Sequence, residues 1–412
     1  MKKNLAAMIM AITLVSCEPM ETPNNLSKQA FNIRIEADYL EENEPAWILL
    51  HDMEGNPLDF KPFSNNVNLA FEIDSNEERV LVTVVKKRDR ESFDRYIVET
   101  ITSVDSKKEF VLGLKKPLRS NSFDPNGEFE VIVSHQQHLN STFISNSEGH
   151  TSGSAIFGGF QSSAKMTLSQ NSQNYFASTR SDSEEIRYSF ISQPQNGQQV
   201  NLTFSQMQTF DKVLKIPYYQ VGSLIYTVKV LEKVAGNWKE SFWLNTNIQE
   251  GHPAIDDYQI GYLNRFETYE TFIRATISSQ TVAGLVKIGK APTTLQLPLS
   301  KNIDMISSKI SNPEINSDMV YNNWSGDWRL RDGSGNLTVM WTVWGKDSGF
   351  KLKAFPLEFT TDHPQFSNLE SFQLISMKLM QSHLDYENLV ERKYVELDIL
   401  EETEEYYLQK RF

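Results

Sequence analysis

Residues 328–344 read WRLRDGSGNLTVMWTVW, and this stretch decides the class of fold. Hydrophobic side chains alternate with other residues on both sides of a central Asp-Gly-Ser-Gly-Asn segment. Alternation places every second side chain on the same face of a strand, and glycine and asparagine favour tight turns. The stretch therefore predicts a β-hairpin that closes at residues 332–336.

The two faces of this hairpin are predicted to differ. Leu337, Val339, Trp341 and Val343 all fall on one face, which is uniformly apolar. Large apolar side chains on such a face are usually buried. We therefore expect Trp341 to lie in a hydrophobic core, and we expect the same of Trp328 on the preceding strand.

Four other aromatic residues are candidate ligand-binding residues. Trp344 lies on the mixed face of the hairpin, and Trp324 precedes the hairpin in a polar segment. Tyr175 and Phe176 lie within residues 134–183, which are dense in Ser, Asn, Gln, Thr and Gly. Exposed aromatic planes can stack against sugar rings. The alternatives are that a neighbouring strand covers these rings, and that the polar stretch forms solvated loops.

Alternating segments of the same kind recur along the chain and indicate further strands. The clearest are residues 31–36, 96–101, 224–230, 375–379 and 395–399. A continuous apolar run at residues 80–85 is typical of a strand that is covered on both faces. One short helix is expected at residues 304–310. We predict an all-β fold of several β-sandwich (immunoglobulin-like) modules in series, with few short helices.

The chain has 412 residues, which is more than one ordinary domain. Turn-rich and proline-containing segments indicate where modules begin and end. The expected parts are a signal peptide (1–16), a lipidated cysteine with a flexible tether (17–30), a β-sandwich module (31–118), a β-rich polar module (128–217), a second β-sandwich module (218–299) and a C-terminal β module (300–412).

Composition excludes several classes of protein. Hydrophobic residues make up 39% of the chain, which is enough for real cores and excludes a wholly disordered chain. The formal net charge of −13 provides no basic face for nucleic acid, so we expect no nucleic-acid partner. The single cysteine excludes an internal disulfide and a cysteine-based metal cluster.

The N-terminus carries the most specific functional signal. Two lysines at Lys2 and Lys3 precede an apolar run, residues 5–15, that is too short to span a bilayer. The run ends in Leu14-Val15-Ser16-Cys17, with a leucine three residues before the cysteine and a small residue directly before it. This pattern resembles the lipobox of bacterial lipoproteins, which are made with a type II signal peptide.

The lipobox resemblance implies that Cys17 is the first residue of the mature protein and carries a diacylglycerol group and a further acyl chain such as palmitate. Two or three acyl chains give stable membrane anchorage. Glu18 and Glu21 are also similar to the acidic signals that follow the cysteine in surface lipoproteins of Bacteroidota. The resemblance implies an outer-membrane lipoprotein, and whether it faces the periplasm or the cell surface stays open.

The sequence supports no catalytic or metal site. His135 and His138 follow an alternating segment, so a strand would point them to opposite faces. Ser162 and Lys165 match one element of the serine β-lactamase pattern, but its partner motifs are missing. The loop that begins at Asp332 lacks the glycine and glutamate of a calcium loop. We expect no catalytic residue, no metal and no cofactor.

Three classes of function remain open. The first is a membrane-anchored extracytoplasmic binding or adhesion module, with glycans as one candidate ligand. The second is a structural accessory subunit that docks onto an outer-membrane protein. The third is a hydrolase whose carboxylates come from separate parts of the chain. An enzyme is the least supported of the three.

Overall fold

The computed structural model describes most of the chain after the expected tether. The described residues are 27–89, 94–113, 125–139, 141–156, 159–169, 173–181, 186–217, 221–234, 237–250, 257–346, 350–394 and 402–412. The expected signal peptide, Cys17 and the strand expected at 395–399 lie outside these residues.

Strands dominate the described residues, which confirms the all-β prediction. The largest sheet has twelve strands. In spatial order they are β19 (Asn237–Glu250), β18 (Ser223–Val234), β21 (Thr268–Thr276), β22 (Thr281–Gly289), β28 (Thr403–Arg411), β27 (Gln373–Ser382), β25 (Asn323–Arg331), β26 (Leu337–Gly345), β6 (Asp94–Asp105), β5 (Arg79–Asp89), β2 (Ala46–His51) and β3 (Pro57–Phe63).

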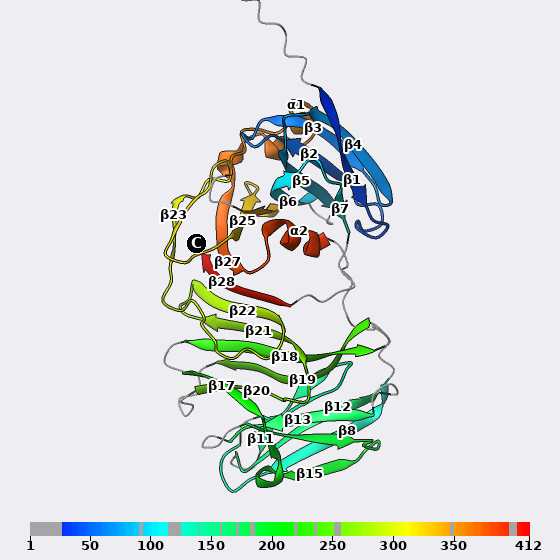
Figure 1. Ribbon diagram of the computed structural model, residues 1–412, viewed down its shortest axis with the longest axis vertical. Helices are drawn as coiled ribbons and strands as arrows, with labels where there is room; N and C mark the ends of the chain where they lie inside the picture. The colour runs from blue at the N-terminus through cyan, green and yellow to red at the C-terminus, as the bar shows by residue number, and fades with distance from the viewer. Residues whose placement is uncertain are drawn as a thin grey trace, which may run out of the picture.

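A three-stranded sheet lies at one end of the elongated molecule, and a pair of facing sheets lies at the other (Figure 1). The three-stranded sheet has the order β4 (Val67–Asp74), β1 (Lys28–Ile35) and β7 (Phe110–Leu112). The facing sheets are, first, β10 (His150–Ser152), β9 (Phe143–Ser145), β13 (Asn174–Thr179), β14 (Arg187–Ser192) and β16 (Gln208–Thr209); and, second, β11 (Ser154–Ile156), β12 (Gln161–Ser169), β8 (Pro125–Ser134) and β15 (Gln199–Thr203).

The remaining elements are short. Two strand pairs are formed by β17 (Lys212–Pro217) with β20 (Asp257–Tyr262) and by β23 (Ile303–Ser307) with β24 (Glu314–Ser317). The helices are α1 (Leu357–Asp362) and α2 (Tyr386–Tyr394), with 3₁₀ turns η2 (Phe204–Gln206), η4 (Pro364–Phe366) and η5 (Leu369–Ser371). No helix among the described residues is long and apolar enough to cross a membrane.

The large sheet joins parts of the chain that the sequence assigned to different modules. Strand β6 from the expected 31–118 module pairs in parallel with β26 from the C-terminal module. Strand β22 from the expected 218–299 module pairs with β28 of that same C-terminal module. One continuous sheet therefore crosses the expected borders between these modules. That the parts fold independently stays a prediction.

Strands β8 to β16 form a two-layer sandwich, whereas β17, also within the expected polar part 128–217, pairs with β20 outside it. The core of the sandwich takes Phe129 and Val131 from one sheet and Ile144, Tyr175 and Ala177 from the other. Alternation along β8 and β13 supplies these inward side chains, as period-2 patterns do in sandwiches. The long polar segments thus surround a conventional apolar core.

Two local expectations are wrong. The helix expected at residues 304–310 is instead the strand β23, in which Ile303 pairs with Ser317. Ile303 and Ile310 are buried, but Ile306 is 69% exposed, so the three isoleucines do not form one helical face. The range expected for the tether, 17–30, also overlaps a strand, because β1 begins at Lys28.

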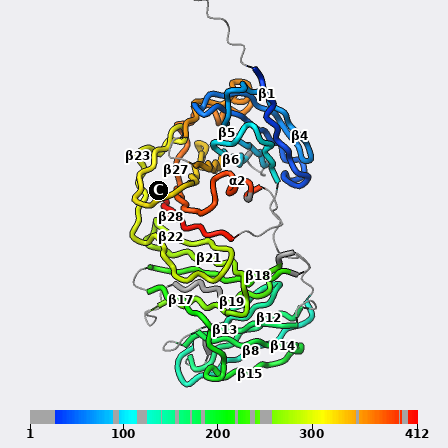
Figure 2. The backbone as a smooth tube through the Cα atoms, in the orientation of Figure 1, coloured from blue at the N-terminus to red at the C-terminus, as the bar shows by residue number. Residues whose placement is uncertain are grey.

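The large sheet curves around helix α2. Strands β6 and β25 lie on one side of the helix, and β28 and β22 lie on the other (Figures 1 and 2). Helix α2 therefore lies against the inner face of the sheet.

Candidate functional site

The hairpin forms as the sequence predicts and positions the candidate site. Strands β25 and β26 are antiparallel, with Trp328 opposite Trp341. The turn is closed by the Asp332 carboxylate, which accepts hydrogen bonds from the backbone N–H groups of Ser334 (2.9 Å) and Asn336 (2.8 Å). Gly335 has a φ of +85°, which glycine adopts without strain.

One face of the hairpin is sealed, which confirms the core prediction for Trp328 and Trp341. Trp328 is fully buried, and Trp341 is 1% exposed. The Trp341 ring stacks on Phe355 with 5.3 Å between ring centroids, and its indole N–H donates to Thr100 Oγ1 at 3.0 Å. We call this face the sealed face. The indole N–H groups of Trp328 and Trp341 both have hydrogen-bond acceptors within the protein.

Three of the four candidate aromatic residues have no exposed face. Trp324, Tyr175 and Phe176 are all fully buried. Trp324 packs so closely on Gly345 that a Cβ there would lie 2.3 Å from its ring. Tyr175 packs on Phe129 in the sandwich core. These rings offer no plane to a sugar, because no part of any of them is exposed to solvent.

Trp344 differs, because it is only half-buried and lies on the inner face of the sheet. Its indole N–H donates to Glu99 Oε1 at 2.8 Å, and its backbone oxygen accepts from the Tyr386 hydroxyl at 2.8 Å. The Lys393 ammonium lies 3.8 Å from the ring centroid and also contacts Glu99. Trp344 is therefore held by a cation–π contact and two hydrogen bonds to groups distant in sequence.

A cavity of about 360 Å³ lies between α2 and the sheet, and we call it the α2 cavity. Its wall is mostly apolar, comes from six elements and carries a few polar groups that converge from five of them. The lining residues are Ile101, Asn323, Trp344, Lys378, Met380, Tyr386, Leu389, Val390, Lys393, Tyr394 and Glu405. Small-molecule sites commonly have this size and this mixture of residues.

The lysines of the α2 cavity are partly withdrawn from water. Burial lowers the pKa of Lys393 to about 7, while contact with the Glu99 carboxylate favours the charged form. Lys378 lies 3.5 Å from Glu405 and 4.5 Å from the centroid of the Tyr407 ring. The cavity thus carries two ammonium groups, one from the sheet and one from the helix.

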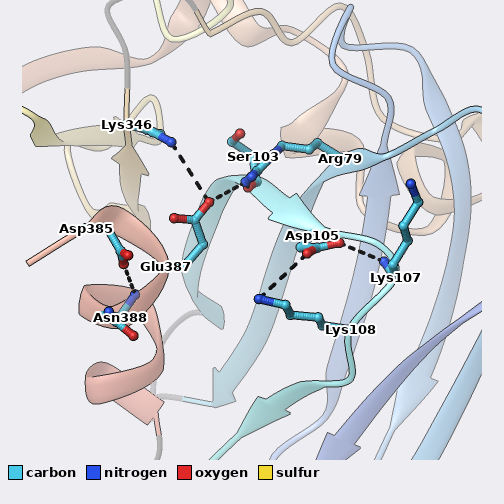
Figure 3. Close-up of polar contacts among 9 residues, drawn as sticks. All are labelled: Arg79, Ser103, Asp105, Lys107, Lys108, Lys346, Asp385, Glu387 and Asn388. Carbon is cyan, nitrogen blue, oxygen red and sulfur yellow. Dashed lines mark hydrogen bonds and ion pairs between the residues drawn. The ribbon is translucent and has the colours of Figure 1, made fainter.

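A second polar cluster holds the N-terminal end of α2 (Figure 3). Arg79 donates to Glu387 at 2.6 Å and to the backbone oxygen of Ser103 at 2.8 Å, and Lys346 lies 3.9 Å from Glu387. Burial favours the neutral form of Glu387, but the hydrogen bond from Arg79 lowers its pKa overall. We call Arg79, Glu387 and Lys346 the helix clamp.

A smaller cavity of about 170 Å³ lies on the clamp side of α2. It shares Ile101, Tyr386 and Val390 with the α2 cavity. Its other lining residues are Ser103, Val104, Asp105, Lys108, Glu109, Phe110, Val111, Glu387 and Glu391. The two cavities therefore flank a common wall formed by one strand residue and two helix residues.

The remaining motifs of the sequence do not assemble into a site. Ser162 is fully buried and accepts from Thr142, whereas Lys165 is exposed and lies 3.8 Å from Glu128. His135 packs on Phe204. Within the described ranges no group of three or more His, Cys, Asp or Glu residues is placed to hold a metal ion.

Most of the residues that line the α2 cavity carry no signal in the sequence that marks them as a site. Helix α2 has nine residues, which is too short for a reliable helical period. A signal for Glu99 was present, because alternation in residues 96–101 separates it from the apolar Tyr96 and Val98.

Comparison with protein-family models and with curated proteins finds no match for this chain.

Proposed function

We propose that the protein is a lipid-anchored extracytoplasmic lipoprotein of the outer membrane that binds a small molecule in the α2 cavity. The anchor rests on the lipobox-like residues that end at Cys17. The binding role rests on one observation: a cavity of about 360 Å³ whose apolar wall carries converging polar groups.

The chemistry of the wall favours a ligand with an apolar body. Met380, Leu389 and Val390 contribute aliphatic surface, and Ile101 completes it. The Lys393 ammonium covers one face of Trp344, so that ring has no free plane for sugar stacking on this side. A glycan would have to bind through Lys378, Glu405 and Asn323 alone.

The binding role is tested with a variant that fills the cavity. We expect the full-length chain with Cys17→Ala to raise its melting temperature with at least one member of a panel of glycans, peptides, nucleosides and lipids. Leu389→Phe, which adds volume at the α2 cavity, should remove that shift. Lys165→Gln, an exposed change in the sandwich, is the control and should retain it. A shift that survives Leu389→Phe would contradict the site, and no shift with any compound would favour a docking subunit.

The anchor is tested separately. The wild-type protein should partition into detergent with the membrane fraction, and mass spectrometry should find an acylated Cys17 at its N-terminus. Cys17→Ala should leave an unprocessed or soluble form. An unmodified thiol at position 17 of the mature protein would overturn the anchor.

A further inference from the structure

A second pocket lies where the neighbouring strands β22, β28 and β27 reach one end of the large sheet, and we call it the β28 pocket. It has a volume of about 410 Å³, and each of its described lining residues has a polar side chain. These residues are Lys287, Gln381, Ser382, His383, Glu402, Thr403, Glu404 and Tyr406. The β28 pocket therefore differs in kind from the α2 cavity, whose wall is mostly apolar.

The register of the three strands brings these side chains together. Lys287 of β22 lies opposite Glu404 of β28, and Gln381 of β27 lies opposite Tyr406 of β28. Directly opposed residues of antiparallel strands share a face of the sheet. Glu405, which lines the α2 cavity, points to the other face, because successive side chains of a strand alternate. The β28 pocket and the α2 cavity therefore lie on opposite faces of the same sheet.

Glu404 already has partners within the protein and orders the wall of the β28 pocket. Its carboxylate contacts Lys287 Nζ and accepts a hydrogen bond from the Tyr406 hydroxyl at 2.7 Å. Burial favours the neutral form of Glu404, but the hydrogen bond from Lys287 lowers its pKa overall. Lys287 and Glu404 therefore form an ionised pair without net charge, and two of the three N–H donors of the ammonium are left for a ligand.

The other side chains of the β28 pocket add both donors and acceptors. His383 Nδ1 accepts from the backbone N–H of Glu404 at 3.0 Å, so the neutral ring carries its proton on Nε2 and can donate it. Glu402 Oε1 accepts from a backbone N–H at 3.3 Å, and the second carboxylate oxygen can accept from a ligand. The Gln381 amide and the Thr403 hydroxyl each provide a donor and an acceptor.

This combination of groups favours an uncharged ligand with several hydroxyls. An anion would meet the carboxylates of Glu402 and Glu404, and a cation would meet the Lys287 ammonium, so an ion of either sign meets a like charge. An apolar molecule would take polar side chains out of water without replacing their hydrogen bonds, which costs free energy. Each hydroxyl of a sugar both donates and accepts, so a sugar ring matches both kinds of group.

We infer that the β28 pocket binds one sugar ring of an uncharged glycan. The sugar hydroxyls accept from Lys287 and His383 and donate to Glu402, and the Gln381 amide bonds a further hydroxyl. Gln381, His383 and Glu402 are exposed, so a ligand reaches them from solvent. This site is separate from the α2 cavity and goes beyond the function proposed for that cavity.

Saturation-transfer NMR tests the class of ligand, because it detects weak binding of small molecules. The methyl glycosides of glucose, galactose, mannose and N-acetylglucosamine are added one at a time to the full-length Cys17→Ala chain. Cyclohexanol, a ring with one hydroxyl, and L-serine, a zwitterion, are the comparison compounds. At least one glycoside should receive saturation from the protein, and the two comparison compounds should receive none. No transfer to any glycoside, or equal transfer to either comparison compound, would overturn the inference.

Variants on β27 and beside it test whether the sugar lies in the β28 pocket. Gln381→Ala removes one hydrogen-bonding group and should weaken binding of the glycoside about fivefold. Gln381→Ala combined with His383→Ala should weaken it about 25-fold. Gln373→Ala changes an exposed glutamine at the other end of β27 and should leave the affinity unchanged. Melting curves establish that each variant is folded, and unchanged affinity in the double variant would overturn the site.

Leu389→Phe separates the β28 pocket from the α2 cavity. This variant fills the α2 cavity and should leave the affinity for the glycoside unchanged. Loss of sugar binding in Leu389→Phe would place the sugar in the α2 cavity and overturn the β28 pocket as its site. If no glycoside binds, but another compound raises the melting temperature and Leu389→Phe removes that rise, the β28 site fails and the function proposed for the α2 cavity stands.

Discussion

The two faces of the β25–β26 hairpin place similar side chains in opposite environments. Trp341 on the sealed face is 1% exposed, stacks on Phe355 and gives its N–H to a neighbouring threonine. Trp344 on the inner face is half-buried, gives its N–H to Glu99 and lies beneath Lys393. The sealed face is covered by loops and by aromatic residues in and beside α1. The inner face is covered by the short helix α2, with the α2 cavity beneath it.

Alternation identifies the two faces of a strand but not what covers each face. The sealed face is dominated by ring-to-ring contacts, which fill space and stabilise the fold. The inner face keeps charged groups paired at its edge and forms part of the wall of the α2 cavity.

The largest effect should come from removing a sealed-face indole. Trp341→Ala should lower the free energy of unfolding by about 3–5 kcal/mol, because a buried ring is replaced by a cavity. Trp324→Ala should behave the same way, since Trp324 is fully buried. Trp344→Ala should cost clearly less, about 1–2 kcal/mol, through the indole hydrogen bond and partial burial. Chemical denaturation measures all three, and equal losses for Trp341→Ala and Trp344→Ala would remove the distinction between the faces.

The aromatic residues that cover the sealed face should also be sensitive to acid through His51 of β2, whose ring contacts Phe355. This residue is fully buried, and burial lowers its pKa to about 4 from the ordinary 6.5. The unfolded chain takes up a proton first as the pH falls, so stability is lost between pH 6.5 and 4 and stays constant below that. The loss should amount to about 3 kcal/mol from this group.

The measurement is the unfolding free energy of wild type and His51→Gln across pH 4 to 7. The variant should lose about 3 kcal/mol less than wild type over this range. His383→Gln changes an exposed histidine and should follow the wild-type curve. Parallel curves for wild type and His51→Gln would contradict the buried, neutral histidine.

The smallest effect is expected at the helix clamp of the inner face. Arg79 and Glu387 are each about one-third exposed, with side-chain exposures of 37% and 33%, so water screens their attraction. Glu387→Gln should cost about 0.5–1 kcal/mol and should speed amide exchange in α2 more than elsewhere. Lys107→Gln breaks a more exposed pair with Glu78 and should leave α2 exchange unchanged. Unchanged exchange in α2 for Glu387→Gln would show that the clamp does not hold the helix.

The sequence predicted the parts of the fold that depend on local patterns. The all-β class, the hairpin with its Asp332 turn and the burial of Trp328 and Trp341 all follow from alternation and turn residues. The isoleucines of residues 303–310 show where such reasoning fails, because a strand followed by a turn reproduces part of a helical spacing.

The candidate site could not be predicted, because it depends on contacts between distant parts of the chain. Trp344 and Glu99 are 245 residues apart, and they meet because β6 pairs in parallel with β26. No local pattern specifies that pairing. Lys393 lies in a nine-residue helix whose position is set by tertiary contacts with Glu99 and the helix clamp.

Two methionines on one strand test whether the inner face binds a ligand and the sealed face does not. Met380 lines the α2 cavity, whereas Met377 packs on Gly326 on the sealed face. The compounds of the glycan, peptide, nucleoside and lipid panel are added to full-length Cys17→Ala protein labelled with ¹³C at the methionine methyl groups, and Met→Leu variants assign the two signals. We expect at least one compound to cause a saturable shift of the Met380 methyl signal with little change at Met377. A shift at Met377 without one at Met380 would contradict this expectation, and so would the absence of a Met380 shift with every compound that binds the chain.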